Sequence, residues 1–290
     1  MRLLPRLALS FALLVSSSLA LAAAPLKVTV YSPGADAMFP VSSALVTGRK
    51  DAILVDAQFG VMQADKVVET IRRSGKHLTT VYVSHGDPDY YFGLERIKAA
   101  FPTARIVATP ETVAHIKETM AAKLAFWGPK LGDNAPTTLV LPEVLDGDTL
   151  KLEGQALKVV GLGGKQPDRT FVWIPSIKAV VGGVVLFNNQ HVWMADTQSP
   201  QSHADWLATL DTISALKPKI VVPGHFMPGP NAPAQAVAFT ANYIRAFDAQ
   251  TASAKDSGEL IAAMKKLYRD AGQEGGLELS AKVAKGEMKW

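Results

Sequence analysis

The 290-residue sequence contains no cysteine. This absence excludes disulfide bonds and any metal site built on thiolate ligands. The sequence also lacks a basic stripe with interleaved aromatic residues, and its formal net charge is only +4. We therefore expect no nucleic acid as a partner. No linker rich in proline, glycine or serine and no clear internal repeat divides the chain, so composition alone indicates no domain boundary.

A long apolar run stands at the beginning of the chain. Arg2 and Arg6 precede apolar residues 7–21, and the Ala-Leu-Ala sequence at 20–22 offers a cleavage site of the A-x-A type. These features predict a secretory signal peptide over residues 1–22. The run is shorter than the ~20 residues that a membrane span needs, so we expect no stable anchor after its removal. The mature protein is expected to be periplasmic or secreted.

Residues 23–290 are expected to form one domain of mixed α and β structure. The sequence pattern predicts alternating strands and helices up to residue 126, then a rigid turn at Trp127-Gly128-Pro129. Short strands dominate residues 138–183, and helices follow from residue 199 onward. Strands and helices in this order favour two packed sheets that are covered by helices.

Four polar side chains follow two of the predicted strands. His85, Asp87 and Asp89 come directly after the buried strand that ends at Val83, and His225 follows another strand in a Pro-Gly-His turn. A polar loop at the carboxyl end of a strand is a common place for chemistry in α/β proteins. Two imidazoles and two carboxylates suffice to bind one Zn²⁺, Mn²⁺ or Fe²⁺ ion. Alternatively, the aspartates cap turns and the histidines satisfy backbone groups.

The remaining histidines give weaker signals. His191 lies in a polar segment, residues 188–193, and is equally consistent with a place in the site and with a structural role. His77 follows a lysine in a polar loop and is expected to be solvated. His115 and His203 lie on predicted helices, where a structural role is the more common one.

Several segments together resemble the metallo-β-lactamase superfamily over nearly all of the mature chain. They are the early hairpin that ends at Asp56, the loop at residues 85–90, the glycine pair at 182–183 after a strand, and Val-Pro-Gly-His at 222–225. The resemblance implies an α/β (α+β) fold, the four-layer αββα sandwich, with the site at one edge of its two sheets.

The family motif H-x-H-x-D-H is only partly kept. His85 and Asp89 match its first histidine and its aspartate, and His225 matches a later ligand. Asp87 stands where the resemblance implies a second histidine, and Tyr90 stands where it implies a third. A phenol is a poor ligand because it must first lose a proton with a pKa of ~10.

Two further positions that the family uses for ligands are glycines here. Gly164 replaces a histidine, and Gly183 replaces the aspartate that bridges two metals in many members. Without the bridging carboxylate, two neighbouring ions would repel each other uncompensated. The resemblance therefore implies at most one divalent metal, Zn²⁺ or else Mn²⁺ or Fe²⁺, or none.

Three functions remain open from the sequence. The first is an exported metal-dependent hydrolase of a small-molecule ester, lactone, thioester or amide, in which Asp87 or Asp89 takes the proton. Its metal ligands would be His85, Asp87, Asp89 and His225, and its substrate pocket would be lined by Tyr90, Tyr91, Trp127, His191 and Trp193. The second is a non-catalytic relative that has lost its metals and binds a small molecule or a protein. The third is a metal-free enzyme in which His85 works with Asp87 or Asp89.

Overall fold

Six strands form the first sheet of the computed structural model, which describes residues 24–290. The predicted signal peptide, residues 1–22, lies outside this range. The strand order is β1-β2-β3-β4-β5-β6, antiparallel from β1 to β3 and parallel from β3 to β6. The strands are β1 (Lys27–Tyr31), β2 (Ser43–Thr47), β3 (Asp51–Val55), β4 (His77–Val83), β5 (Arg105–Ala108) and β6 (Glu143–Val144).

A second sheet of five strands has the order β12-β10-β9-β8-β7, and β11 and β13 form a short parallel pair. These strands are β7 (Thr149–Leu152), β8 (Gln155–Val160), β9 (Phe171–Ile174), β10 (Ala179–Val181), β11 (Phe187–Asn188), β12 (Ile220–Val221) and β13 (His225–Phe226). The sequence pattern also predicts a strand at 139–141, but pairing begins only at Glu143.

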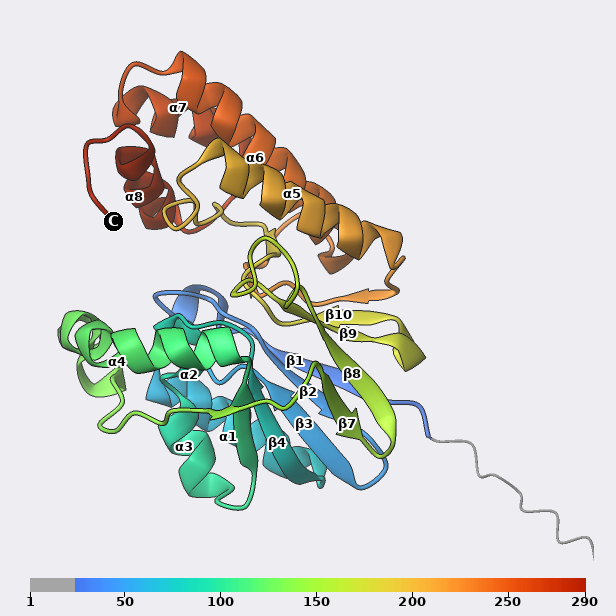
Figure 1. The fold of residues 1–290 in the computed structure, drawn as a ribbon. Helices are drawn as coiled ribbons and strands as arrows, with labels where there is room; N and C mark the ends of the chain where they lie inside the picture. The colour runs from blue at the N-terminus through green and yellow to red at the C-terminus, as the bar shows by residue number, and fades with distance from the viewer. Residues whose placement is uncertain (1–23) are drawn as a thin grey trace, which may run out of the picture.

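Helices cover the outer faces of both sheets. Figure 1 shows α1 (Val61–Ser74), α2 (Pro88–Tyr91), α3 (Leu94–Ala100) and α4 (Pro110–Leu131) beside the first sheet. It shows α5 (Pro200–Ala215) and α6 (Ala236–Ser253) on the side of the second sheet, with α7 (Ser257–Leu267) and α8 (Glu274–Ala284) beyond α6. Within residues 24–290, no helix has the length and apolar character needed to cross a membrane. The predicted αββα arrangement is confirmed.

The two faces of the first sheet are buried by different partners. On β3, Ile53 and Val55 join a buried cluster with side chains of the second sheet, including Val172. Ala52 and Leu54 point the other way and belong to the larger cluster that includes the helices. Successive side chains of a strand alternate between its faces, so a strand buried on both sides must be apolar throughout. The uninterrupted run of residues 52–55 follows from this requirement.

Helix α4 is longer than the sequence predicted. It begins as expected, with Pro110 in its first turn and the Thr109 hydroxyl accepting a hydrogen bond from the Thr112 amide. The predicted turn at residues 127–129 is wrong, because the helix continues through Pro129 to Leu131. Pro129 has no amide hydrogen to donate to the Ala125 carbonyl, so the helix lacks one hydrogen bond there and ends two residues later. Lys123 and Trp127 are consequently carried on one continuous helix.

A buried hydrogen-bond chain fixes the loop that follows β4. The Asp56 carboxylate accepts hydrogen bonds from the Ser84 amide (2.8 Å) and the Ser84 hydroxyl (2.7 Å). The Ser84 hydroxyl accepts one in turn from the Gly183 amide, at 2.8 Å, so the chain links the two sheets. Burial raises the pKa of Asp56 to about 7, although both bonds from Ser84 oppose this rise. Asp56 therefore holds the start of the His85 loop against the second sheet.

Replacing Asp56 by alanine is expected to lower the free energy of unfolding by about 3 kcal/mol, because the buried amide and hydroxyl of Ser84 lose their partner. Alanine would also have to adopt the left-handed backbone conformation of Asp56, whose φ is 66°. Asp56→Asn keeps an acceptor oxygen and tolerates this conformation, so it should cost clearly less. Urea unfolding of the three proteins measures the difference. Equal losses for alanine and asparagine would contradict this role of the carboxylate.

Candidate functional site

A cavity of about 680 Å³ opens where the loops after β4 and β10 meet the end of the chain. Polar side chains form one part of its wall, and aromatic rings form another. Seven residues predicted for the site line it together: His85, Asp87, Asp89, Trp127, His191, Trp193 and His225. Phe39, Phe59 and Trp290 extend the aromatic wall. The fold therefore gathers residues that lie far apart in the chain.

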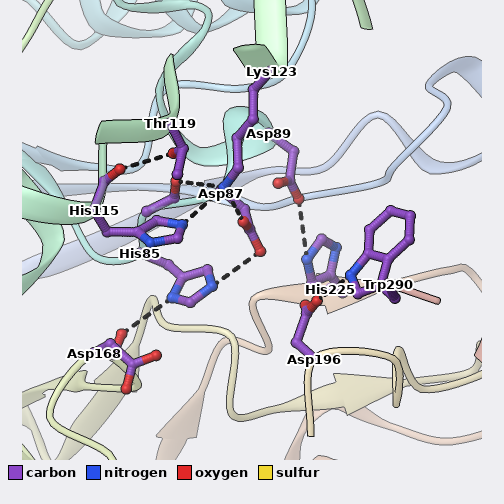
Figure 2. Close-up of polar contacts among 11 residues, drawn as sticks. His85, Asp87, Asp89, His115, Thr119, Lys123, Asp168, Asp196, His225 and Trp290 are labelled. Carbon is purple, nitrogen blue, oxygen red and sulfur yellow. Dashed lines mark hydrogen bonds and ion pairs between the residues drawn. The ribbon is translucent and has the colours of Figure 1, made fainter. Parts of the chain in front are cut away.

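His85 has both of its ring nitrogens engaged. Its Nε2 atom lies 3.1 Å from an oxygen of Asp87, and its Nδ1 atom lies 3.1 Å from the backbone carbonyl oxygen of Asp168 (Figure 2). A carboxylate and a carbonyl only accept hydrogen bonds, so both nitrogens donate and the ring is an imidazolium. Burial alone lowers the pKa of His85, but Asp87 outweighs it and the net pKa is raised. His85 thus presents no lone pair to a metal ion.

The second oxygen of Asp87 is bound by Lys123. The Lys123 ammonium lies 2.7 Å from this oxygen, 2.9 Å from Nε2 of His115 and 3.2 Å from the carbonyl oxygen of Gly86 (Figure 2). Burial raises the pKa of Asp87, but the His85 and Lys123 cations outweigh it and hold the pKa below its ordinary value. Asp87 is therefore a carboxylate whose charge the protein neutralises itself.

A second histidine–aspartate pair lies on the other side of Tyr90. Nε2 of His225 lies 3.2 Å from an oxygen of Asp89, and the Phe187 ring stacks on the His225 imidazole. The ring of Tyr90 stands edge-on to both His85 and His225, at centroid distances of 5.3 and 5.6 Å. Burial, with the nearby carboxylates, raises the pKa of Tyr90 well above its ordinary value. Tyr90 separates the two pairs as a neutral phenol.

The two glycines that stand where the family resemblance implies ligands are closely packed. A Cβ atom on Gly183 would lie 2.1 Å from the Thr170 carbonyl oxygen, and the φ of Gly183 is 83°. A Cβ atom on Gly164 would lie 2.9 Å from the Gly161 carbonyl oxygen. The backbone has closed over the positions where an aspartate and a histidine would have to stand.

These donors do not fit a metal ion. No group of three or more histidine, aspartate or glutamate side chains in residues 24–290 is arranged to hold one. The nitrogens of His85 are occupied, Asp87 is shared between two cations, and Tyr90 stands between His85 and His225. The arrangement therefore supports ion pairs within the protein rather than metal coordination.

Three residues predicted to line the substrate pocket differ in where the structure places them. His191 lines the cavity and contacts the Tyr243 hydroxyl through Nδ1, at 2.9 Å. Tyr91 lies in the core instead, 1% exposed and edge-on to Phe92, because the one-turn helix α2 directs it inward. Tyr90 is likewise fully buried and reaches the site only through its contacts with the two histidine rings.

The sequence missed several residues of the site. His115, for which a structural role was predicted, lines the cavity and contacts Lys123. These two residues are eight positions apart on α4 and so lie near the same face, a signal that the sequence does contain. His203, by contrast, is held away from the cavity wall by Asp248 and the Thr197 carbonyl, in agreement with its predicted structural role.

Arg169 and Asp196 add buried charge to the same cavity. The Arg169 guanidinium lies over the Trp206 ring, at 4.3 Å, and is 6% exposed. Its Nε and Nη2 atoms find no hydrogen-bond acceptor among residues 24–290, and burial lowers its pKa. Asp196 accepts a hydrogen bond from the Trp290 indole, at 2.6 Å, and burial raises its pKa. Neither residue has a motif around it that the sequence could have revealed.

Restoring the family's aspartate at residue 183 is expected to destabilise the protein. In Gly183→Asp the new Cβ atom collides with backbone, and an L side chain takes a positive φ, so the free energy of unfolding should fall by at least about 3 kcal/mol. Gly163→Ala is the control, because a Cβ atom there meets nothing within 4 Å. Urea unfolding checks both variants. A Gly183→Asp protein of wild-type stability would show that this position is not closed.

His191 is expected to make stability depend on pH. Burial lowers its pKa to about 4, whereas an unfolded histidine has a pKa near 6.5. Between these values the unfolded chain binds more protons, so stability is lost as the pH falls from about 6.5 toward 4. The stability of wild type relative to His191→Gln should drop by about 2 kcal/mol between about pH 7.5 and about pH 4.5. Parallel pH profiles of the two proteins would contradict this expectation.

Known proteins confirm the fold. A metallo-β-lactamase from Pontibacter korlensis has a TM-score of 0.54 at 19% identity, over 76% of this chain and 99% of its own. DIM-1 metallo-β-lactamase has a TM-score of 0.52 at 18% identity, and the match covers 76% of this chain and 93% of its own. A metallo-β-lactamase family protein from Thermus thermophilus has a TM-score of 0.60 at 20% identity, and the match covers 90% of this chain and 91% of its own. No curated protein matches the chain. The family model described as the metallo-β-lactamase superfamily matches residues 37–225, so the chain belongs to this superfamily.

Proposed function

We propose that this metallo-β-lactamase-fold protein binds a small organic molecule in its cavity without the help of a metal ion. The observation that carries the proposal is the closed set of ion pairs at the position of the family's motif. His85 has no free nitrogen, and Asp87 is neutralised by His85 and Lys123. Both ring nitrogens of His85 and both oxygens of Asp87 are therefore satisfied without an ion.

The shape and lining of the cavity suit such a ligand. Small-molecule sites usually have volumes of roughly 300–1,000 Å³, with apolar walls and a few polar groups that orient the ligand. Here the rings of Phe39, Trp127 and Trp193 form one apolar wall, with Phe39 edge-on to both tryptophans. Asp89 and Arg169 offer polar contacts at another part of the same cavity. A ligand with an aromatic or aliphatic body and a polar end would use both parts.

Metal-dependent hydrolysis is the competing function, and the family membership speaks for it. It needs at least one imidazole lone pair and one free carboxylate directed at the same point. The hydrogen bonds of His85 and Asp87 use up the groups of that pair, and in the second pair Nε2 of His225 faces Asp89. A metal-free reaction with His85 as the base meets the same obstacle, because a ring that donates from both nitrogens takes up no proton. Binding is therefore the function that the geometry supports best.

Export is a separate part of the proposal. It is supported by the signal-peptide pattern of residues 1–22. Together with the cavity, it suggests that the ligand is met outside the cytoplasm.

Ligand binding can be measured by quenching of tryptophan fluorescence with a panel of aryl carboxylates, esters, lactones and thioesters. We expect at least one compound to bind equally well with and without EDTA. Trp127→Ala should raise its Kd at least about tenfold, because it removes part of the aromatic wall. Met62→Ala is the control, since this side chain is 54% exposed and lies outside the cavity lining.

The same panel can also contradict the proposal. Turnover of any compound that EDTA abolishes and Zn²⁺ restores would establish the metal-dependent hydrolase instead. Binding that is lost on chelation would contradict metal-free binding.

A further inference from the structure

The Lys123 ammonium sits among three hydrogen-bond acceptors, as a metal ion would. We propose that Lys123 is a built-in cation that keeps divalent metals out of this site, and that its removal creates a metal site from Asp87, His115 and the Gly86 carbonyl. The inference rests on the metal-free cavity of the proposed function. It adds the reason why the cavity stays free of metal.

The contacts of Lys123 carry the inference. An ammonium group has three protons, and its three acceptors are an oxygen of Asp87, the carbonyl oxygen of Gly86 and Nε2 of His115, all within 3.2 Å (Figure 2). The Lys123 side chain is only 21% exposed. The partly buried Lys123 ammonium thus has one acceptor for each of its three protons.

The imidazole contact distinguishes this site from an ordinary salt bridge. Lysine only donates hydrogen bonds, so Nε2 of His115 must accept one and carries a lone pair directed at the ammonium. The same lone pair is what a histidine offers to a divalent metal. An imidazole nitrogen, a carboxylate oxygen and a carbonyl oxygen are thus directed at one point that holds a positive charge.

Helix α4 is what brings the cation to this point. It carries both Lys123 and His115, and it spans Pro110–Leu131 beside the loop of Asp87. A divalent ion that approached Asp87 would meet the ammonium 2.7 Å from the carboxylate oxygen and be repelled. The positive charge that a bound metal ion would supply to Asp87 is here supplied by the Lys123 side chain.

The test is a Co²⁺ titration of four proteins followed by visible absorption and calorimetry. Lys123→Met removes the charge and keeps most of the stem, and it should bind one equivalent of Co²⁺ at least about tenfold more tightly than wild type. Lys123→Arg keeps the charge and should show no gain. Lys130→Met is the matched control on the same helix, where the ammonium lies over the Phe126 ring.

A double variant identifies the ligands. Adding His115→Ala to Lys123→Met should return the Co²⁺ affinity to that of wild type. If the gain survives this change, or if Lys123→Met stays within about twofold of wild type, the proposal is wrong. A gain for Lys123→Arg as large as that for Lys123→Met would overturn it as well.

Two further measurements keep the result decisive. Lys123→Gln is a second variant without the charge, to be used if Lys123→Met does not fold, and circular dichroism reports the fold of each. Binding of the organic ligand with EDTA is measured on wild type alone. If wild type does not bind the organic ligand in EDTA, the proposed function is wrong. If the Co²⁺ affinity of the Lys123 variants is unchanged, only the present inference is wrong.

Discussion

The carboxylate of Asp87 is the group on which the site depends. One of its oxygens faces the His85 ring and the other faces the Lys123 ammonium. A partly buried carboxylate needs compensating charge, which His85 supplies from the loop after β4 and Lys123 supplies from helix α4. This arrangement fixes the protonation of His85, fills both oxygens of Asp87 and places α4 against the loop. The chemistry open to the cavity follows from these consequences.

The packing of the glycines agrees with this electrostatic picture. Gly183 approaches the Thr170 carbonyl so closely that no side chain fits, and its amide donates to Ser84. The Asp56–Ser84–Gly183 chain thus uses the end of β10 to hold the two sheets together. At a position where the family resemblance implies a metal ligand, this chain uses backbone for structure. The loss of ligands and the gain of internal ion pairs therefore lie in one connected region.

The sequence was sufficient to predict the fold because the fold depends on local patterns. Continuous apolar residues predicted strands buried on both faces, as found in β3. The threonine and proline at 109–110 correctly predicted the beginning of α4. The turn predicted at Trp-Gly-Pro, residues 127–129, placed its end too early. A proline usually ends a helix, and sequence alone does not reveal whether tertiary packing will carry the helix past it. The error mattered, since the same helix carries His115, Lys123 and Trp127.

The sequence by itself determined which residues stand where the family resemblance implies ligands: His85, Asp89 and His225 match it, and residues 164 and 183 are glycines. It also brought Asp87 and Tyr90 to notice as departures from the family motif. Only the tertiary structure decided what holds Asp87, because Lys123 lies 36 positions away and meets it through the packing of α4. Hydrogen bonds act over about 3 Å in space, whatever the separation in the chain. For that reason a motif can name the groups of a site but cannot state what already occupies them.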